Sequence, residues 1–397
     1  MSLRRQLLVS FGLQGIGAAA VLVATLWLGF SLGPEVQGGF NRAKSEVEFI
    51  AAFAMFGLPQ ALFFHVKSDA LGMRAAMTWV YRSSWLALVI GGAWSLLQHP
   101  RDGALPWLLA AAVAAMVAHG QLRTLLLVRE RTVWFNIVTA APQLLVLASV
   151  GWVVVAGTAP RPAVWFCAFA AAFGLVALAA WRRLQAATDA AGVAADTAAS
   201  GWRSLGHYGF AAWLTAVLST GAVIAMQQWV EEGAGRVALG QFTLAMTLVQ
   251  IPLTPIAYAA PLLLRRWMER PDARAAHRWA AILFLALLCI AGGVWLLSMR
   301  WPDLGLGAAY SGATRALALL LVGAAAEAAS RLMTVQAGAS GLPWVAVRAE
   351  AARWAVLASA ALAPLPHGLM AWCAVWSLAS IAAALVFVWH GRSARAR

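Results

Sequence analysis

The sequence has little charge for its length. Only 11% of its 397 residues are charged, and lysine occurs twice, whereas 62% are hydrophobic. Soluble domains carry about 25% charged residues, so this composition excludes an ordinary soluble domain. The net charge of +14 does not indicate a nucleic-acid partner, because the basic residues lie between apolar runs, as in the cytoplasmic loops of membrane proteins.

Cysteine is also scarce, and Cys167, Cys289 and Cys373 all lie inside apolar runs. An odd number without metal-ligand spacing predicts neither a disulfide framework nor a metal site. The chain has no G-x-x-x-x-G-K-[ST] nucleotide loop and no H-E-x-x-H zinc motif. We therefore expect no catalytic residues, no metal and no cofactor, and a protein that is not an enzyme.

Long apolar runs are what the sequence has in quantity. Runs of 18 or more residues recur, each long enough to cross a bilayer core of about 30 Å as a helix, and the alternating pattern of a barrel is absent. We predict an all-α integral membrane protein with about 12 transmembrane helices. The predicted spans are residues 6–32, 46–66, 77–98, 105–127, 133–156, 162–181, 204–229, 237–264, 277–299, 312–335, 343–364 and 368–390.

The distribution of arginine and lysine predicts the orientation of these spans. If the N-terminus is cytoplasmic, the inner loops and termini hold 22 basic residues and the outer loops hold 7. Cytoplasmic loops carry such an excess. We therefore predict a multi-pass protein with both termini in the cytoplasm.

The chain also repeats itself. Phe40 is matched 202 residues later by Phe242, and Pro59 by Pro261 at the same spacing. A polar, small-residue stretch at residues 185–200 separates the two copies. We predict an N-terminal bundle (1–184), a cytoplasmic linker (185–202) and a C-terminal bundle (203–397). An even number of spans in each copy gives two parallel six-helix bundles.

Ionisable residues inside spans are the first site candidates, because a charge in lipid is costly and usually faces a cavity or a partner. The tenth span carries Glu327 and Arg331, and the fourth carries His119 and Arg123 at positions 208 residues earlier. Two explanations stay open. The arginines could line a cavity and bind phosphate bidentately. Alternatively, Glu327 could pair with Arg331 while both arginines extend to cytoplasmic head groups.

The eleventh span carries Arg348, Glu350 and Arg353. If its helix begins near Pro343, Arg353 lies about 15 Å inside at 1.5 Å per residue, near the bilayer midplane. A later start would leave all three in the interface. Arg353 is the strongest single candidate for contact with a substrate.

The second span begins with Glu46 and Glu48, and acids in a first helical turn complement the helix dipole. Arg42, just before them, could instead draw an anionic head group outward. Gln14 and Gln60 suit a sugar-lined cavity, although helix–helix hydrogen bonds explain them equally.

Prolines predict bends in two spans, because proline removes a backbone hydrogen bond. Pro59 lies in the second span, and Pro252, Pro255 and Pro261 lie in the eighth. Bends that serve movement and bends that serve packing alone both stay open.

The first 70 residues resemble the start of O-antigen-type polysaccharide flippases, of the multidrug/oligosaccharidyl-lipid/polysaccharide exporter superfamily. The resemblance rests on a G-P-E-x-x-G-x-F loop at residues 33–40 and on the phrase FGLPQA at residues 56–61. The inserted Pro59, the sparse lysines and the short chain depart from that family's pattern.

This resemblance implies two bundles forming a V, alternating access, and a central cationic cavity. The implied substrate is a polyprenyl-diphosphate-linked oligosaccharide, moved from the inner to the outer leaflet of a bacterial inner membrane during polysaccharide or lipopolysaccharide biosynthesis. The implied partners are that substrate, membrane lipids and other polysaccharide-assembly proteins. The candidate substrate-binding residues are Arg353, Arg123, Arg331, Arg348, Glu350, Glu327, Arg42, Gln14 and Gln60.

Three other functions compete. A drug/cation antiporter of the same superfamily should carry acidic groups in its N-terminal cavity, and the first span has none. A major-facilitator transporter also has six plus six helices, and Asp69, Gly72 and Arg74 faintly match its loop motif, with His65 in place of the leading glycine. A membrane glycosyltransferase or polymerase would be an enzyme and usually has a large catalytic loop, which this chain lacks.

Overall fold

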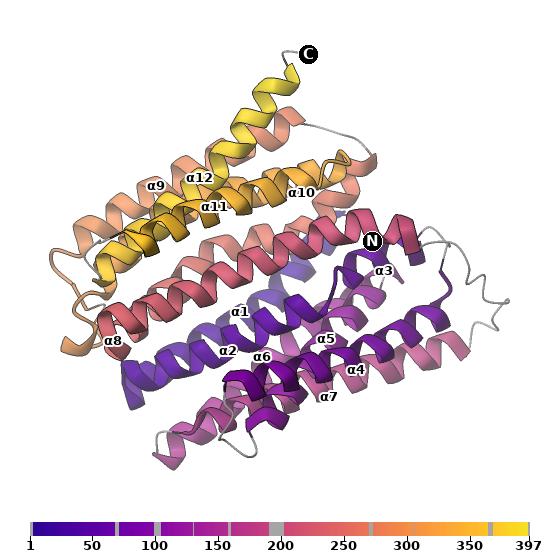
Figure 1. Ribbon diagram of the computed structural model, residues 1–397, viewed down its shortest axis with the longest axis horizontal. Coiled ribbons are helices and arrows are strands. Elements are labelled where there is room, and N and C mark those ends of the chain that lie inside the picture. The colour runs from indigo at the N-terminus through magenta and orange to yellow at the C-terminus, as the bar shows by residue number, and fades with distance from the viewer. Residues whose placement is uncertain are drawn as a thin grey trace. The chain divides into compact units, whose positions relative to one another are not determined.

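The computed structural model describes residues 3–67, 71–98, 105–129, 131–157, 160–189, 202–269, 273–303, 305–363 and 368–395. All regular structure in these ranges is helical (Figure 1). The α-helices are α1 (Leu3–Leu32), α2 (Pro34–Ala54), α3 (Leu58–Lys67), α4 (Met73–Gln98), α5 (Leu105–Val128), α6 (Thr132–Ala156), α7 (Pro162–Asp189), α8 (Trp202–Glu269), α9 (Ala273–Leu297), α10 (Ala313–Ala339), α11 (Trp344–Leu362) and α12 (Leu369–Arg395). A 3₁₀ turn, η1 (Ala308–Tyr310), precedes α10.

Each of the twelve predicted spans coincides with a helix, with α2 and α3 together forming the second span. The seventh and eighth spans are two arms of α8, separated at Gly235, whose φ of 85° and ψ of 174° are not helical. Eight helices among the described residues are long and apolar enough to cross a membrane, or nine if the bent pair α2 and α3 is one span. The two arms of α8 are counted together as one helix in that number. α4 and α11 are not among these helices, and α11 carries three charged residues, Arg348, Glu350 and Arg353.

The corner between α1 and α2 corrects the prediction of a G-P-E loop. Gly33 has a φ of 85° and ends α1, where its amide N donates to the Gly29 carbonyl at 3.2 Å. Left-handed glycine is the common helix terminator, and proline is favoured at a first helical position. Pro34 therefore opens α2 directly, and the predicted loop is the first two turns of a helix.

The bend predicted at Pro59 is present, but its main cause lies just before the proline. α2 and α3 differ in direction by 54°, and the chain between them places Phe56 at a φ of 46° and Gly57 at 69°. A Cβ on Gly57 would lie 2.0 Å from the Gly209 carbonyl oxygen, so this approach needs glycine. The Trp213 indole N–H donates to the Phe53 carbonyl at 2.8 Å, and this bond satisfies one acceptor that the broken helix leaves open.

The bends predicted at the prolines of the eighth span are not breaks in the helix. α8 keeps helical backbone angles through Pro252, Pro255 and Pro261, and Gly235 is the residue that breaks it. α7 continues to Asp189, so residues 185–189 of the predicted linker are helical. Residues 190–201, which make up most of the rest of the linker, lie outside the described residues.

The chain divides into two compact units. The first holds Met1–Ala24 and Arg42–Thr220, and the second holds Thr25–Asn41 and Gly221–Arg397. In the first unit, α5 packs against α4 and α7 around core residues such as Val80, Leu125 and Ala180. In the second unit, α10 packs against α9 and α12, and α11 against α12, around an apolar core of its own. The predicted boundaries at residues 184 and 203 remain a prediction.

Candidate functional site

The ionisable residues of the second unit form a charged cluster, which begins on α10. Arg331 Nη2 lies 2.5 Å from Glu327 Oε1, and Arg331 Nε donates to the same oxygen at 3.0 Å. Arg331 Nη2 also lies 3.3 Å from Gln250 Oε1 on α8. Glu327 is buried. The helical pairing considered for Glu327 and Arg331 is therefore present, and the arginine also connects α10 to α8.

Arg353 on α11 is the most enclosed arginine of the cluster. The helix begins at Trp344, as the deep placement required, so Arg353 lies about 14 Å along it at 1.5 Å per residue. Its relative exposure is 2%, its Nη1 lies 3.2 Å from Glu350 Oε2, and its guanidinium carbon lies 5.4 Å from the centre of the Trp376 ring on α12. This ion pair and cation–π contact offset the cost of burying a guanidinium.

The two halves of the cluster also influence each other. Arg353 and Arg331 both act electrostatically on Glu327 and on Glu350. Two arginines and two glutamates, all ionised, would carry no net charge. Arg353 Nε is buried without a hydrogen-bond partner among the described residues, whereas Glu350 Oε2 is held in the ion pair with Arg353 Nη1. A buried donor of this kind costs about 1–3 kcal/mol, so the cluster has a donor available for a ligand.

Arg348 does not belong to this cluster. It lies on α11 but is exposed, whereas Ala349 beside it is buried. The three charged residues that the sequence grouped on one span therefore separate into an ion pair between buried Arg353 and half-buried Glu350, and an arginine on the surface.

In the first unit, the predicted hydrogen-bonding glutamine Gln14 takes part in a buried polar contact. Its Nε2 donates to Asn136 Oδ1, and Asn136 Nδ2 donates to Ser10 Oγ at 3.0 Å. These bonds join α1 to α6. The helix–helix explanation of Gln14 is thus present in the structure. The same polar atoms could exchange bonds with a sugar if the helices part.

Arg123 and His119 lie one turn apart on α5, and their surroundings differ from those of Glu327 and Arg331. The His119 Nε2 atom is 2.8 Å from the Val138 carbonyl oxygen on α6, and its ring packs edge-on against Phe173 on α7. The Arg123 guanidinium carbon lies 5.8 Å from the Phe135 ring centre, and the side chain is half-buried. His119 therefore has a packing role, and Arg123 has an aromatic partner.

The acids of α2 are not in a first turn, which corrects the dipole explanation. α2 begins at Pro34, so Glu46 and Glu48 lie beyond its first turns. Their partners are side chains instead: Trp94 Nε1 donates to Glu46 Oε1 at 3.1 Å, and Lys44 Nζ lies 3.2 Å from Glu48 Oε1. Arg42 is half-buried within the same helix rather than in a preceding loop.

Gln60 is exposed beside the break between α2 and α3, where it lines a cavity of about 130 Å³ in the first unit. Glu48, Met116 and Trp213 line the same cavity, together with small residues. Trp213 and Trp376 were absent from the predicted site. Tryptophans within spans are the signal that could have identified them, but with 21 in the chain that signal is weak.

Known proteins resemble the chain in structure but not in sequence. No protein-family model matches it, and a search of curated proteins by sequence found no match. Solved structures match it over nearly its whole length. A MATE in complex with MaL6 matches with a TM-score of 0.69 at 15% identity, covering 98% of this chain and 96% of that one.

Two further matches come from named organisms. A mutant of the Vibrio cholerae MATE transporter VcmN gives a TM-score of 0.65 at 15% identity, covering 98% of this chain and 97% of that one. A MOP superfamily transporter from Pyrococcus furiosus gives 0.66 at 14% identity, covering 98% and 93%. The protein is therefore an all-α integral membrane protein with the twelve-helix, two-bundle fold of MATE transporters.

Proposed function

We propose that this protein is a membrane transporter that works by alternating access and carries a polyprenyl-diphosphate-linked oligosaccharide from the inner to the outer leaflet of a bacterial inner membrane. The transport part of the proposal is supported by the fold, which matches MATE transporters across 98% of the chain. Because the matched structures are transporters, the fold also supports the proposal that this protein is not an enzyme.

The substrate part of the proposal rests on Arg353. A diphosphate needs donors in a fixed fork, and a guanidinium supplies them. Arg353 is held by Glu350 and Trp376, while its Nε is buried without a hydrogen-bond partner among the described residues. The orphaned Nε is the single observation that carries the proposal, because a phosphate oxygen would satisfy it.

The burial of Arg353 fits a state in which the cluster is closed. Because the residue is 2% exposed, a diphosphate can reach it only after helices move apart. Alternating access supplies such a movement. Arg331 with Glu327 would then provide a second guanidinium, and the exposed Arg348 would contribute at the mouth of the path.

The remaining candidates take supporting roles in the proposal. Arg42 and Arg123 would attract the anionic head group, and Gln14 and Gln60 would hydrogen-bond to sugar hydroxyls. The lipid tail would stay in the bilayer. With both termini cytoplasmic, the protein would work beside other polysaccharide-assembly proteins and would not bind nucleic acid.

A drug/cation antiporter of the same fold is the second candidate. The matched structures are MATE transporters, and Glu327 and Glu350 are acids that could attract a cation. Each is balanced by an arginine, however, and α1 carries no acidic residue. The Pyrococcus furiosus neighbour is described as having a binding pocket of reverse polarity that suggests a different function. Members of this fold thus differ in pocket charge. The matches give no structural support to the major-facilitator alternative.

Deletion of the gene in its own host tests the proposal. We expect lipid-linked oligosaccharide to accumulate on the cytoplasmic leaflet, and plasmid-borne wild-type protein to restore export. Resistance to cationic dyes should not change. A deletion strain with normal surface polysaccharide and a raised sensitivity to cationic dyes would replace the flippase by the antiporter.

A further inference from the structure

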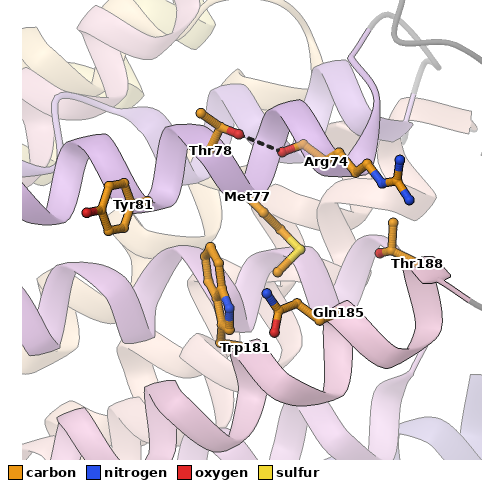
Figure 2. Close-up of a pocket in the computed structure, with 7 residues that line it drawn as sticks. All are labelled: Arg74, Met77, Thr78, Tyr81, Trp181, Gln185 and Thr188. Atoms are coloured by element: carbon orange, nitrogen blue, oxygen red, sulfur yellow. Dashed lines mark hydrogen bonds between the residues drawn. The ribbon is translucent and has the colours of Figure 1, made fainter.

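A second cavity lies in the first unit, and no predicted site residue is among those that line it. It has a volume of about 370 Å³, and its lining comes from α4 and α7, both of which pack on α5. Its seven lining residues are Arg74, Met77, Thr78, Tyr81, Trp181, Gln185 and Thr188. Figure 2 shows the Arg74 guanidinium and Thr188 at one end, Tyr81 at the other, and Trp181 and Gln185 facing Met77 across the space. The volume is within the range of small-molecule sites.

The position of the cavity indicates a ligand that belongs to the membrane interface. Arg74 is in the first turn of α4, and Thr188 is in the last turn of α7, so the polar end of the cavity is at the ends of two membrane helices. The basic-residue bias predicts that these ends face the cytoplasm. Trp181 and Tyr81 lie farther along the helices, and such residues concentrate at the head-group level of bilayers.

Along α4, the cavity continues into an apolar surface. Arg74, Thr78, Tyr81, Trp85 and Val89 follow one another at spacings of three or four, so they share one face of the helix. All five are exposed. The face changes from a cation through a hydroxyl and aromatic rings to an aliphatic side chain as it enters the membrane.

α7 shows the same order from its opposite end. Thr188, Gln185, Trp181, Leu178 and Leu175 also follow at spacings of three or four, and the two leucines are exposed. The two faces together run from a polar cavity to an apolar track. This is the polarity profile of a phospholipid, whose head group, glycerol backbone and acyl chains follow in the same order.

The chemistry of the lining selects among phospholipids. Arg74 supplies the cation that a phosphodiester requires, and no carboxylate is among the seven lining residues, so the lining offers no anionic partner to the ammonium group of phosphatidylethanolamine. The Thr78 and Thr188 hydroxyls donate to carbonyls of their own helices, at 3.1 and 2.8 Å. Their oxygen lone pairs can accept bonds from head-group hydroxyls.

We propose that the cavity formed by Arg74, Met77, Thr78, Tyr81, Trp181, Gln185 and Thr188 is a binding site for an anionic glycerophospholipid with a hydroxylated head group, such as phosphatidylglycerol. Arg74 binds the phosphodiester, Gln185 and the threonines bind the head-group hydroxyls, and an acyl chain lies along the track below. All its lining residues belong to the first unit, and none of them belongs to the charged cluster of the second unit.

Native mass spectrometry of the purified full chain tests this site with added phosphatidylglycerol and phosphatidylethanolamine of equal chain length. We expect phosphatidylglycerol to bind more tightly, and Arg74→Gln to weaken it about tenfold, because a hydrogen bond to a charged group is lost. Arg74→Lys should lose less. Arg82→Gln is the matched control: Arg82 is exposed on the same helix but stacks over Trp79, outside the cavity, and its loss should change binding less than about twofold.

Three results would overturn the proposal: equal or tighter binding of phosphatidylethanolamine, the same loss in Arg82→Gln as in Arg74→Gln, or displacement of the lipid by millimolar inorganic phosphate. The last would identify a free-phosphate site instead. In the unsubstituted protein, phosphatidylglycerol carrying a photoreactive head group should label peptides that contain Met77 or Gln185. Labelling spread evenly over the helices would contradict the site.

Discussion

At the scale of single residues, Arg353 combines two properties that usually exclude each other. It is almost fully buried in a membrane helix, and one of its donors is still unsatisfied by the described residues. Glu350 and Trp376 compensate most of the burial cost, so a guanidinium can be kept in place without a ligand. Arg353 is therefore the residue at which a role in transport can be separated most cleanly from a role in stability.

Replacing Arg353 should stop transport. Arg353→Ala removes the fork and leaves Glu350 buried alone, which is expected to cost about 3–5 kcal/mol of stability. The double variant Arg353→Met with Glu350→Gln removes both charges and should accumulate normally. We expect neither to export lipid-linked oligosaccharide, whereas Arg353→Lys should export at a reduced rate. Export is measured in the deletion strain, with membrane protein quantified.

Arg315→Ala is the control in the same unit, since Arg315 is exposed on α10 and belongs to no proposed site, so its loss should have a much smaller effect. Normal export by a well-expressed double variant would remove Arg353 from the substrate path and leave the fold assignment intact.

The Gln14–Asn136 contact separates the two explanations given for Gln14. Asn136→Leu alone leaves buried polar atoms with fewer partners and should lower stability by about 1–3 kcal/mol. Gln14→Leu with Asn136→Leu removes both and should recover most of that loss. The thermal stability of each variant, monitored by size-exclusion chromatography after heating, gives the comparison. A stable double variant without transport assigns Gln14 to the substrate, and a stable double variant with full transport assigns it to packing.

Sequence patterns predicted the ion pairs within one helix but not the partners that these residues have on other helices. Glu327–Arg331 and Glu350–Arg353 follow from helical spacing, which is fixed by the backbone. The partners on other helices, such as Gln250 and Trp376, do not follow from it, because they depend on how helices pack.

At the scale of elements, the break between α2 and α3 is the most constrained feature of the first unit. Pro59 predicted a bend, but proline in a first helical turn is tolerated without strain. The left-handed angles at Phe56 and Gly57 make the break, and Gly209 lies against it. A contact between residues so far apart in sequence cannot be read from local propensity. The start of α2 at Pro34, by contrast, follows the common glycine–proline rule, and the sequence interpretation as a loop overlooked it.

Gly57→Ala should destabilise the protein by more than about 2 kcal/mol, because the left-handed angle costs about 1–2 kcal/mol and the new Cβ meets the Gly209 carbonyl. Gly12→Ala is the matched control. Gly12 is in the interior of α1 with no atom within 4 Å of an added Cβ, so alanine there should be neutral or stabilising by up to about 1 kcal/mol. Equal melting temperatures for the two variants would show that the described break is wrong.

At the scale of the whole molecule, the helix count follows from hydropathy, since twelve predicted spans match the helices of the structure. A further pair of matched residues belongs to the predicted repeat. Gly38 and Gly240 are also 202 residues apart, and a Cβ on Gly38 would lie 3.2 Å from the Gly240 amide nitrogen. This close approach joins two positions that the predicted repeat matches, and the parallel orientation of the two copies stays a prediction.

Orientation in the membrane is predicted from the arginine bias alone. A cysteine at Arg161, which is exposed before α7, should react with an impermeant maleimide in intact cells, whereas a cysteine at Arg182, exposed near the other end of α7, should react only after lysis. The native cysteines Cys167, Cys289 and Cys373 are replaced in the background. Labelling of position 182 from outside would reverse the predicted topology.

The central claim, movement of a lipid-linked oligosaccharide, is tested most directly in proteoliposomes. Purified protein is reconstituted with a fluorescent polyprenyl-diphosphate oligosaccharide, and the fraction accessible to a membrane-impermeant quencher is followed with time. We predict that the wild-type protein raises the transbilayer rate well above that of empty liposomes, and that the Arg353→Met, Glu350→Gln double variant does not. A rate equal to that of empty liposomes, with uptake of a cationic dye by the same preparation, would contradict the claim.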